Sequence, residues 1–301
     1  MKKILFIVLS LLFLLCACSK QEQTTPATEP EAEVIQTAPA DVTEATEPEA
    51  TEAIGEEAEG ETQTPNKTGT AYRLVRMTVL DENGSESWHQ EYFYDDHGRE
   101  KRTEQYTDGV ITSSTAVTYT DSGRELLYTY PEGRTMTVRE TWDDQGNLTL
   151  WECIEDGAVE YYTEYTYNEK GWLLGYTTVY TQEGSPLSGT YEYDDRGNQI
   201  LVREYTGDEL MGETRREFDE NNRRTKAVYS DALSDWGFSY QYTWSGNTET
   251  AIQYDSDGTE TMKTVTAYDE TGNILSQETW QDGVMVSCTE YTYENIEIIA
   301  E

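Results

Sequence analysis

From residue 71 onward, apolar and polar residues alternate with a period of two. Residues between the apolar positions are mostly Glu, Thr, Gln and Ser. In three segments the residues that share one face are mostly aromatic: Trp88, Gln90, Tyr92 and Tyr94; Val159, Tyr161, Thr163, Tyr165 and Tyr167; and Trp236, Phe238, Tyr240 and Tyr242. Such alternation is typical of antiparallel strands with one apolar face and one wet face. The pattern therefore predicts an all-β fold.

Glycines divide these strands at regular intervals. A turn of the Tyr-Asp-Asp-x-Gly type recurs with a mean step of about 25 residues, and an aromatic residue stands four positions before each turn residue. The turn residues are Gly98, Gly123, Gly146, Gly171, Gly197, Asn222, Gly246 and Gly272. The aromatic residues are Tyr94, Tyr119, Trp142, Tyr167, Tyr193, Phe218, Tyr242 and Tyr268. A fixed period of this size signals a repeat architecture.

Turn chemistry explains the residues at these positions. Asp194 suits the first position of a type I turn, and Gly197 supplies the left-handed residue of a bulge. A second series of turns carries Asp-Gly or Glu-Gly at positions 108, 132, 156, 183, 257 and 282, with Asn83-Gly84 opening it and degenerate members at 207 and 230. Together the two series predict up to eighteen antiparallel strands, one roughly every 10–15 residues.

A sheet with so many strands accumulates twist and does not stay flat. We expect tandem antiparallel β-hairpin repeats that form one long curled or spiral sheet. Strict alternation through bulged turns puts five further residues on the aromatic face and leaves three tyrosines off it. The five are Tyr106, Ile154, Tyr205, Tyr254 and Trp280, and the three are Tyr130, Tyr180 and Tyr229.

The amino terminus carries the features of an export signal. Lys2 and Lys3 precede an apolar run that is too short to span a membrane, which needs about 20 residues. The run ends in Leu-Cys-Ala-Cys, which resembles a bacterial lipobox. We expect cleavage after residue 17 and lipidation of Cys18, because Cys16 would have the bulky Leu15 at its −1 position. Two acyl chains suffice for stable anchoring, at the extracytoplasmic face of a bacterial cell membrane.

Residues 18–70 form the second region. After Cys18 they are rich in Glu, Thr, Ala and Pro and contain no aromatic residue, and residues 21–70 carry a net charge of −12. Such a composition cannot bury enough apolar surface to offset chain entropy. We expect a disordered acidic tether there, followed by the repeat domain over residues 71–301.

The repeats resemble those of a known family. The string from Tyr191 to Asn198, Tyr-Glu-Tyr-Asp-Asp-Arg-Gly-Asn, is similar to the YD repeat of the rearrangement-hotspot (RHS) family, and related strings recur at 92–99, 165–172 and 266–273. The resemblance covers about 72–301. It implies a ribbon of hairpins that winds into a spiral or shell, in proteins that are often found on the cell surface. The period is longer than is usual in the family, and we find no motif of a toxin shell.

Charge narrows the choice of partner. The chain has 21 basic and 59 acidic residues and a net charge of −38, which excludes binding to nucleic acid or to anionic headgroups by charge neutralisation. Aromatic side chains and carboxylates remain as recognition groups. The leading hypothesis is a non-enzymatic surface protein that binds a neutral glycan or a protein. The alternatives are a structural spacer, or a glycan-processing enzyme or accessory subunit with an unrecognised carboxylate site.

No catalytic, cofactor or metal motif stands out. His89 and His97 are close in sequence, but one is expected on a strand and the other in a turn. Cys153 and Cys288 would form a disulfide only if the fold brought distant repeats together. Turns such as 255–258, Asp-Ser-Asp-Gly, invite a calcium hypothesis, but a four-residue turn offers too few oxygens. We therefore predict neither catalytic residues nor bound cofactors.

Overall fold

The computed structural model describes residues 68–182 and 184–299. Cys18, the signal peptide and nearly all of the predicted tether lie outside the described residues. Within these described ranges, one short 3-10 turn, η1 (Pro131–Gly133), accompanies eighteen strands. The strands are β1 (Thr68–Leu80), β2 (Glu86–Tyr94), β3 (Glu100–Thr107), β4 (Val110–Thr120), β5 (Gly123–Thr129), β6 (Thr135–Trp142), β7 (Leu148–Glu155), β8 (Ala158–Tyr167), β9 (Leu173–Tyr180), β10 (Leu187–Tyr193), β11 (Gln199–Thr206), β12 (Glu209–Phe218), β13 (Arg224–Asp231), β14 (Gly237–Ser245), β15 (Thr248–Asp255), β16 (Glu260–Tyr268), β17 (Ile274–Gln281) and β18 (Val284–Ile299).

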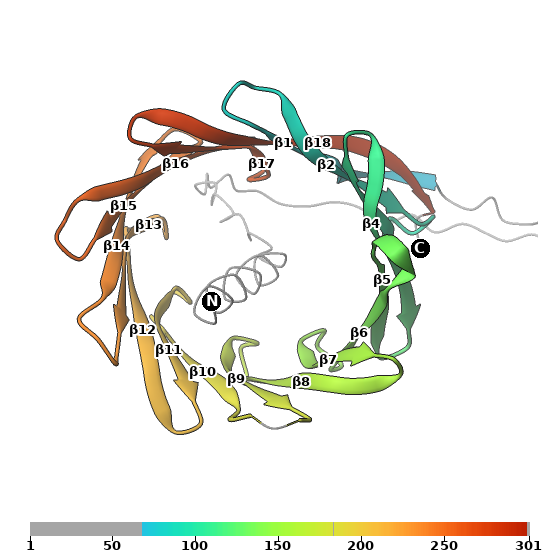
Figure 1. The fold of residues 1–301 in the computed structure, drawn as a ribbon, viewed down its shortest axis with the longest axis horizontal. Coiled ribbons are helices and arrows are strands. Elements are labelled where there is room, and N and C mark those ends of the chain that lie inside the picture. Colours follow the sequence, from blue (N-terminus) through green and yellow to red (C-terminus); the bar gives the residue numbers. More distant parts are fainter. Residues whose placement is uncertain (1–67, 183, 300–301) are drawn as a thin grey trace, which may run out of the picture. The chain divides into compact units, whose positions relative to one another are not determined.

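The sheet closes on itself. Each strand pairs antiparallel with its neighbours in sequence, and β1 also pairs with β18 from Thr68 opposite Ile299 to Leu80 opposite Cys288. The eighteen strands therefore form an up-and-down barrel, seen as a ring in Figure 1. The expectation of tandem antiparallel hairpins is confirmed, but the expectation of an open curled or spiral sheet is wrong. Closure satisfies the backbone groups that two free edge strands would expose.

Strand connections alternate between two rims of the barrel. The rim that holds Thr68 and Ile299 is called here the terminal rim, and the opposite one the distal rim. Six of the eight Asp-x-x-Gly turns lie on the terminal rim, because these turns connect every second pair of strands for most of the circuit. The turn starting at Asp194 is representative of all eight.

In that turn, the Gly197 amide donates to the Asp194 carbonyl (3.1 Å), and the Asp194 amide donates to the carbonyl of Asn198 (3.0 Å). The Asp194 carboxylate accepts the amides of Arg196 (3.0 Å) and Asn198 (2.8 Å). The φ angle of Gly197 is +88°, as the sequence predicted for Gly146, Gly197 and Gly272. The same pattern begins at Asp81, Asp95, Asp143, Asn168, Asp219, Asp255 and Asp269.

The structure corrects the predicted turn series at several places. Gly123 is a residue of β5 without positive φ, and Gly246 belongs to a tight two-residue connection, so neither forms an Asp-x-x-Gly turn. Gly84 and Gly258 were assigned to the second series but close the four-residue turns that start at Asp81 and Asp255. The Asp-Gly pairs at 108, 156 and 282 have positive φ at both residues, as type I′ hairpin turns require.

Three of the aromatic residues that precede a terminal-rim turn tie one repeat to the one before it. The Tyr167 hydroxyl donates to the Leu148 carbonyl (2.9 Å), and the Tyr193 hydroxyl donates to the carbonyl of Leu173 (2.9 Å). Tyr94 reaches the Leu74 carbonyl (2.6 Å) in the same way. At these three positions the aromatic residue is therefore explained by a hydrogen bond across the sheet as well as by apolar burial.

The barrel wall has an aromatic inner face and a charged outer face. Side chains crowd together on a concave surface, and most buried side chains belong to the inner face: Thr103, Thr115, Leu126, Val138, Cys153, Thr163, Thr178, Ala227, Glu249, Ala251 and Thr266. Thr163 and Thr178 share a hydrogen bond of 2.8 Å there. The hydrophobic core is thus a layer along the inner wall.

Bulges correct the predicted assignment of aromatics to the two faces. Register shifts at five strand ends place Tyr106, Ile154, Tyr205, Tyr254 and Trp280 in phase with outer-face residues. By contrast, Tyr180 pairs directly with Tyr161, and Tyr229 pairs with Phe238, which puts both on the inner face. The predicted positions of these seven residues were wrong because one extra residue reverses the alternation.

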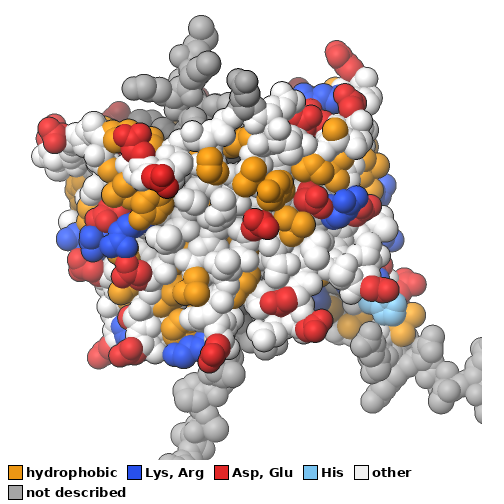
Figure 2. Space-filling view, turned by 90° about the horizontal axis from the view of Figure 1, so that it is seen from below, with side chains coloured by type: hydrophobic (Ala, Val, Ile, Leu, Met, Phe, Trp, Pro, Cys, Tyr) orange, Lys and Arg blue, Asp and Glu red, His pale blue; other side chains and the backbone are white. Residues whose placement is uncertain are grey.

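Ion pairs cover much of the outer face. Arg139 contacts Glu125 (2.9 Å) and Glu152 (3.4 Å), and Arg203 contacts Glu192 (2.6 Å) and Glu213 (3.5 Å). In Figure 2, small groups of hydrophobic side chains alternate with charged and other polar ones on the side of the barrel. None of the described residues forms a helix with the length and apolar character needed to cross a membrane.

Candidate functional site

A run of aromatic side chains follows β14 along the inner wall. It consists of Trp236, Phe238, Tyr240 and Tyr242 and is called here the β14 aromatic track. Successive ring centroids are 5.5, 5.7 and 5.9 Å apart. Because an extended strand rises about 3.3 Å per residue, the track is about 20 Å long. It runs from the distal rim towards the terminal rim.

Alternation along β14 positions the track. The intervening residues Gln241 and Thr243 are exposed on the outer face, so the rings share the inner face. Neighbouring strands hold the rings in place: Tyr229 of β13 stacks on Phe238 at 5.0 Å, and the Tyr240 hydroxyl donates to the side-chain oxygen of Gln253 on β15 (2.9 Å). The track is therefore a fixed surface rather than a set of independent side chains.

At the distal end of the track, a cleft of about 330 Å³ lies between the β13–β14 connection and the turn that begins at Asp255. Trp236 lines it and keeps 51% of its surface exposed, although Tyr229 and Phe238 contact it edge-on. Asp231 and Asp235 also line the cleft. An exposed indole beside several carboxylates offers an apolar platform and hydrogen-bond acceptors at one place.

At the other end of the track, an arginine side chain lies against an aromatic ring. The Arg224 guanidinium lies 4.1 Å from the centre of the Tyr242 ring. Burial raises the pKa of Tyr242 to about 12, although the charge of Arg224 opposes this shift. Burial also raises the pKa of the nearby Glu249 carboxyl, which Arg224 again opposes. This end is therefore a desolvated, charged environment, unlike the cleft.

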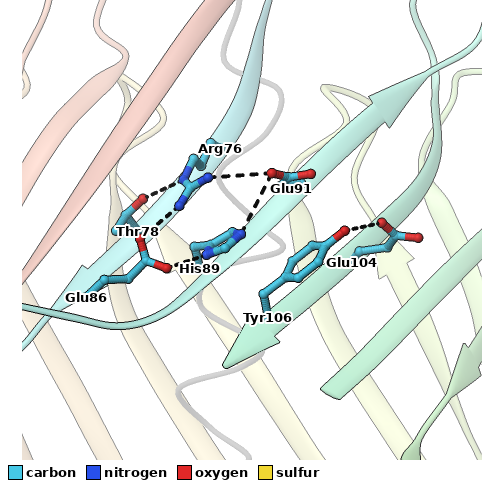
Figure 3. A network of polar contacts seen from close by, with 7 residues as sticks. All are labelled: Arg76, Thr78, Glu86, His89, Glu91, Glu104 and Tyr106. Atoms are coloured by element: carbon cyan, nitrogen blue, oxygen red, sulfur yellow. Dashed lines mark hydrogen bonds and ion pairs between the residues drawn. The ribbon is translucent and has the colours of Figure 1, made fainter. Parts of the chain in front are cut away.

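A second polar cluster lies on the outer face and contains one of the two histidines (Figure 3). His89 Nδ1 is 2.5 Å from a Glu86 oxygen, its Nε2 is 3.8 Å from Glu91, and its ring stacks on Tyr106 at 4.7 Å. Arg76 contacts both carboxylates. Hydrogen bonding to His89 lowers the pKa of Glu86, although burial opposes it. This cluster joins the closing strand β1 to β2 and β3.

The structure separates the other residues weighed as candidates. His97 is exposed in the turn after β2 and does not meet His89. Cys153 on β7 and Cys288 on β18 are both free thiols. In the 255–258 turn, the Asp255 carboxylate accepts two backbone amides. Within the described ranges, no group of three or more His, Cys, Asp or Glu side chains is placed to hold a metal ion.

Two inner-wall residues near the track were missed at the level of the sequence. Arg216 and Arg224 read as ordinary charged strand residues, and strict alternation assigns Arg224 to the outer face with Lys226. A register shift between Glu217 and Phe218 pairs Arg224 with Phe218 and so turns it inward. The only available signal was the position of Arg224 directly after an Asp-x-x-Asn turn.

Comparisons with known proteins give distant likenesses only. No protein-family model and no curated protein matches the chain. A porin-like protein from Bacteroides uniformis has 13% identity and a TM-score of 0.40, with 73% of this chain and 96% of that chain covered. A porin-like protein from Bacteroides vulgatus has 12% identity and a TM-score of 0.36, with 73% and 98% covered. The TcdB2-TccC3-Cdc42 structure has 11% identity and a TM-score of 0.27, and the likeness covers 68% of this chain but 16% of that one. These values do not indicate a family.

Proposed function

We propose that the barrel is a non-enzymatic carbohydrate-binding domain and that the β14 aromatic track is its binding surface. The observation that carries the proposal is the half-exposed indole of Trp236 in a cleft with carboxylates, at the head of a continuous line of rings. A large aromatic side chain in a folded protein is normally buried, and an exposed one in a concave site is typical of ligand recognition.

The chemistry of the track suits a saccharide. Sugar rings present C–H faces that pack on aromatic rings, and their hydroxyl groups donate hydrogen bonds to carboxylates. Asp231 and Asp235 supply such acceptors beside Trp236. A track of about 20 Å is long enough for an oligosaccharide rather than a single sugar. A polysaccharide or the glycan of a partner is therefore the proposed ligand.

The proposed setting follows from the amino terminus and the charge. Lipidation of Cys18 would hold the protein on the extracytoplasmic face of the membrane, with the acidic segment up to residue 70 as a tether. Residues 71–301 carry a net charge of −29, which repels polyanions at long range. In this proposal the protein presents a YD-like repeat barrel at the bacterial surface, where neutral glycans bind it without electrostatic repulsion.

The test is a glycan-array screen of the full-length protein at physiological salt, followed by calorimetric titration of the best neutral oligosaccharide. Trp236→Ala should weaken binding by at least about tenfold, which corresponds to 1.4 kcal/mol. Trp280→Ala is the matched control, because register places Trp280 on the outer face, where its indole donates to Glu278 (3.0 Å). Equal binding by the wild type and Trp236→Ala, or no oligosaccharide bound at all, would refute the proposal.

A further inference from the structure

Two arginines lie side by side on the inner wall at the terminal-rim end of the β14 aromatic track. Arg216 is on β12 and Arg224 on β13. The Arg216 side chain donates to the side-chain oxygen of Gln199, and Arg224 lies over the Tyr242 ring. Burial lowers the pKa of Arg216, and the positive charge of Arg224 lowers it further. Two like charges are therefore held close together in a desolvated place.

Several other arginines of the barrel wall are paired with carboxylates. On the outer face, Arg139 and Arg203 each contact two carboxylates. On the inner face, Arg124 forms a two-pronged contact with Glu140, at 2.8 and 3.3 Å. Among the described residues, neither Arg216 nor Arg224 forms an ion pair with a carboxylate. Arg216 and Arg224 thus differ from these three arginines, which are each paired with a carboxylate.

One donor of the pair has no acceptor. The Nε atom of Arg224 is buried and has no hydrogen-bond partner. Buried donors are almost always satisfied in folded proteins, and an orphan at a surface of this kind needs an explanation. Two carboxyl groups, Glu204 and Glu249, interact electrostatically with the arginine pair. Burial raises the pKa of both, while Arg216 and Arg224 respectively oppose that shift.

We propose that Arg216 and Arg224 form an oxyanion-binding subsite, and that it takes the carboxylate of a uronic-acid residue in a saccharide bound along the β14 aromatic track. The guanidinium forks match the geometry of a carboxylate, and a carboxylate oxygen would satisfy the buried Nε of Arg224. The identification of the anion as part of a sugar rests on the proposed function. The subsite itself rests on the arginine pair.

The subsite changes the expectation drawn from net charge. A charge of −29 over the barrel acts at long range and is screened within about 8 Å at physiological salt. Two arginines on neighbouring strands of a desolvated wall act locally and are screened much less. The protein should therefore bind a mildly acidic oligosaccharide with isolated carboxylates, while dense polyanions remain excluded.

The experiment compares an oligosaccharide that carries a single uronic-acid residue with its methyl ester, which keeps the sugar ring and removes the charge. The full-length protein is titrated with both by calorimetry at physiological salt. We expect the acidic oligomer to bind about tenfold more tightly than the ester. Arg216→Gln and Arg224→Gln should each bring this ratio close to one. Arg215→Gln is the matched control, because it removes the same charge one residue away. The Arg215 side chain is 61% exposed on the outer face.

The outcomes separate this proposal from the carbohydrate proposal. An unchanged ratio in both arginine variants, or a ratio equally reduced by Arg215→Gln, overturns the subsite while sugar binding stands. If neither oligomer binds, the wild type is titrated with sodium phosphate alone. Phosphate binding that is lost in Arg216→Gln supports the oxyanion site and overturns its assignment to a sugar. Absence of phosphate binding overturns the site itself.

Discussion

Gly197 and Gly272 allow one steric contact to be isolated from backbone strain. They occupy the same position in two Asp-x-x-Gly turns, with φ angles of +88° and +89°. A methyl group at Gly197 would meet the Trp172 ring at 2.9 Å, whereas one at Gly272 would meet nothing within 4 Å. Replacement of either glycine by alanine should therefore destabilise the turn by the same left-handed backbone strain, on the order of 1–2 kcal/mol. Only Gly197→Ala should carry an additional clash.

The clash has a calculable scale because the Trp172 ring cannot move freely. It packs on Tyr193 at 5.3 Å and carries Lys170 at 4.3 Å. Forcing one extra methyl into such a contact costs about 1–3 kcal/mol. We expect the free energy of unfolding to fall by that much more in Gly197→Ala than in Gly272→Ala, as measured by urea denaturation followed by circular dichroism. The slope with denaturant should stay the same in both variants.

A double variant sharpens the test. In Trp172→Leu the ring is gone, so adding Gly197→Ala should cost only the strain measured at Gly272. Equal destabilisation by the two single alanine variants would contradict the contact. So would a clash energy that persists after Trp172 has been replaced.

Three further predictions concern the repeat contacts, acid stability and anchoring. Tyr193→Phe removes the hydrogen bond to the Leu173 carbonyl and should lower the free energy of unfolding in urea by about 0.5–1.5 kcal/mol; no change would show that the ring alone matters. Burial raises the pKa of Asp269, but hydrogen bonds from its own turn outweigh this and lower it from 3.8 to about 2. This carboxylate should therefore stabilise the fold above pH 3.8 and lose its contribution as the pH falls through about 2, and thermal melts of Asp269→Asn should show a smaller loss over that window. Cys18→Ser should leave an unlipidated precursor that leaves the detergent phase, while Cys16→Ser should behave as the wild type.

Local turn chemistry made much of the fold predictable. The first Asp or Asn of each four-residue turn accepts two backbone amides through its side-chain oxygen, and the fourth residue takes positive φ, so the residue types mark the turn. Closure was not predictable in the same way. The pairing of β1 with β18 depends on the summed twist and coil of all eighteen strands. Neither strand has a residue pattern that identifies the other as its partner.

Bulges limited what could be said about the faces of the wall. Trp236, Phe238, Tyr240 and Tyr242 alternate without interruption, so their shared face was visible in the sequence. Tyr106 and Arg224 each follow a register shift, so the face they occupy depends on one unpaired residue. The exposure of Trp236 also depends on how the β13–β14 connection folds at the rim, which no spacing rule fixes.

The most direct test of the carbohydrate proposal is a crystal structure of the full-length protein with the tightest-binding oligosaccharide. The account predicts sugar density on the inner wall, with one ring packed against Trp236 and the chain continuing past Tyr240. Density on the outer wall, or a bound sugar that makes no contact with Trp236, would contradict it.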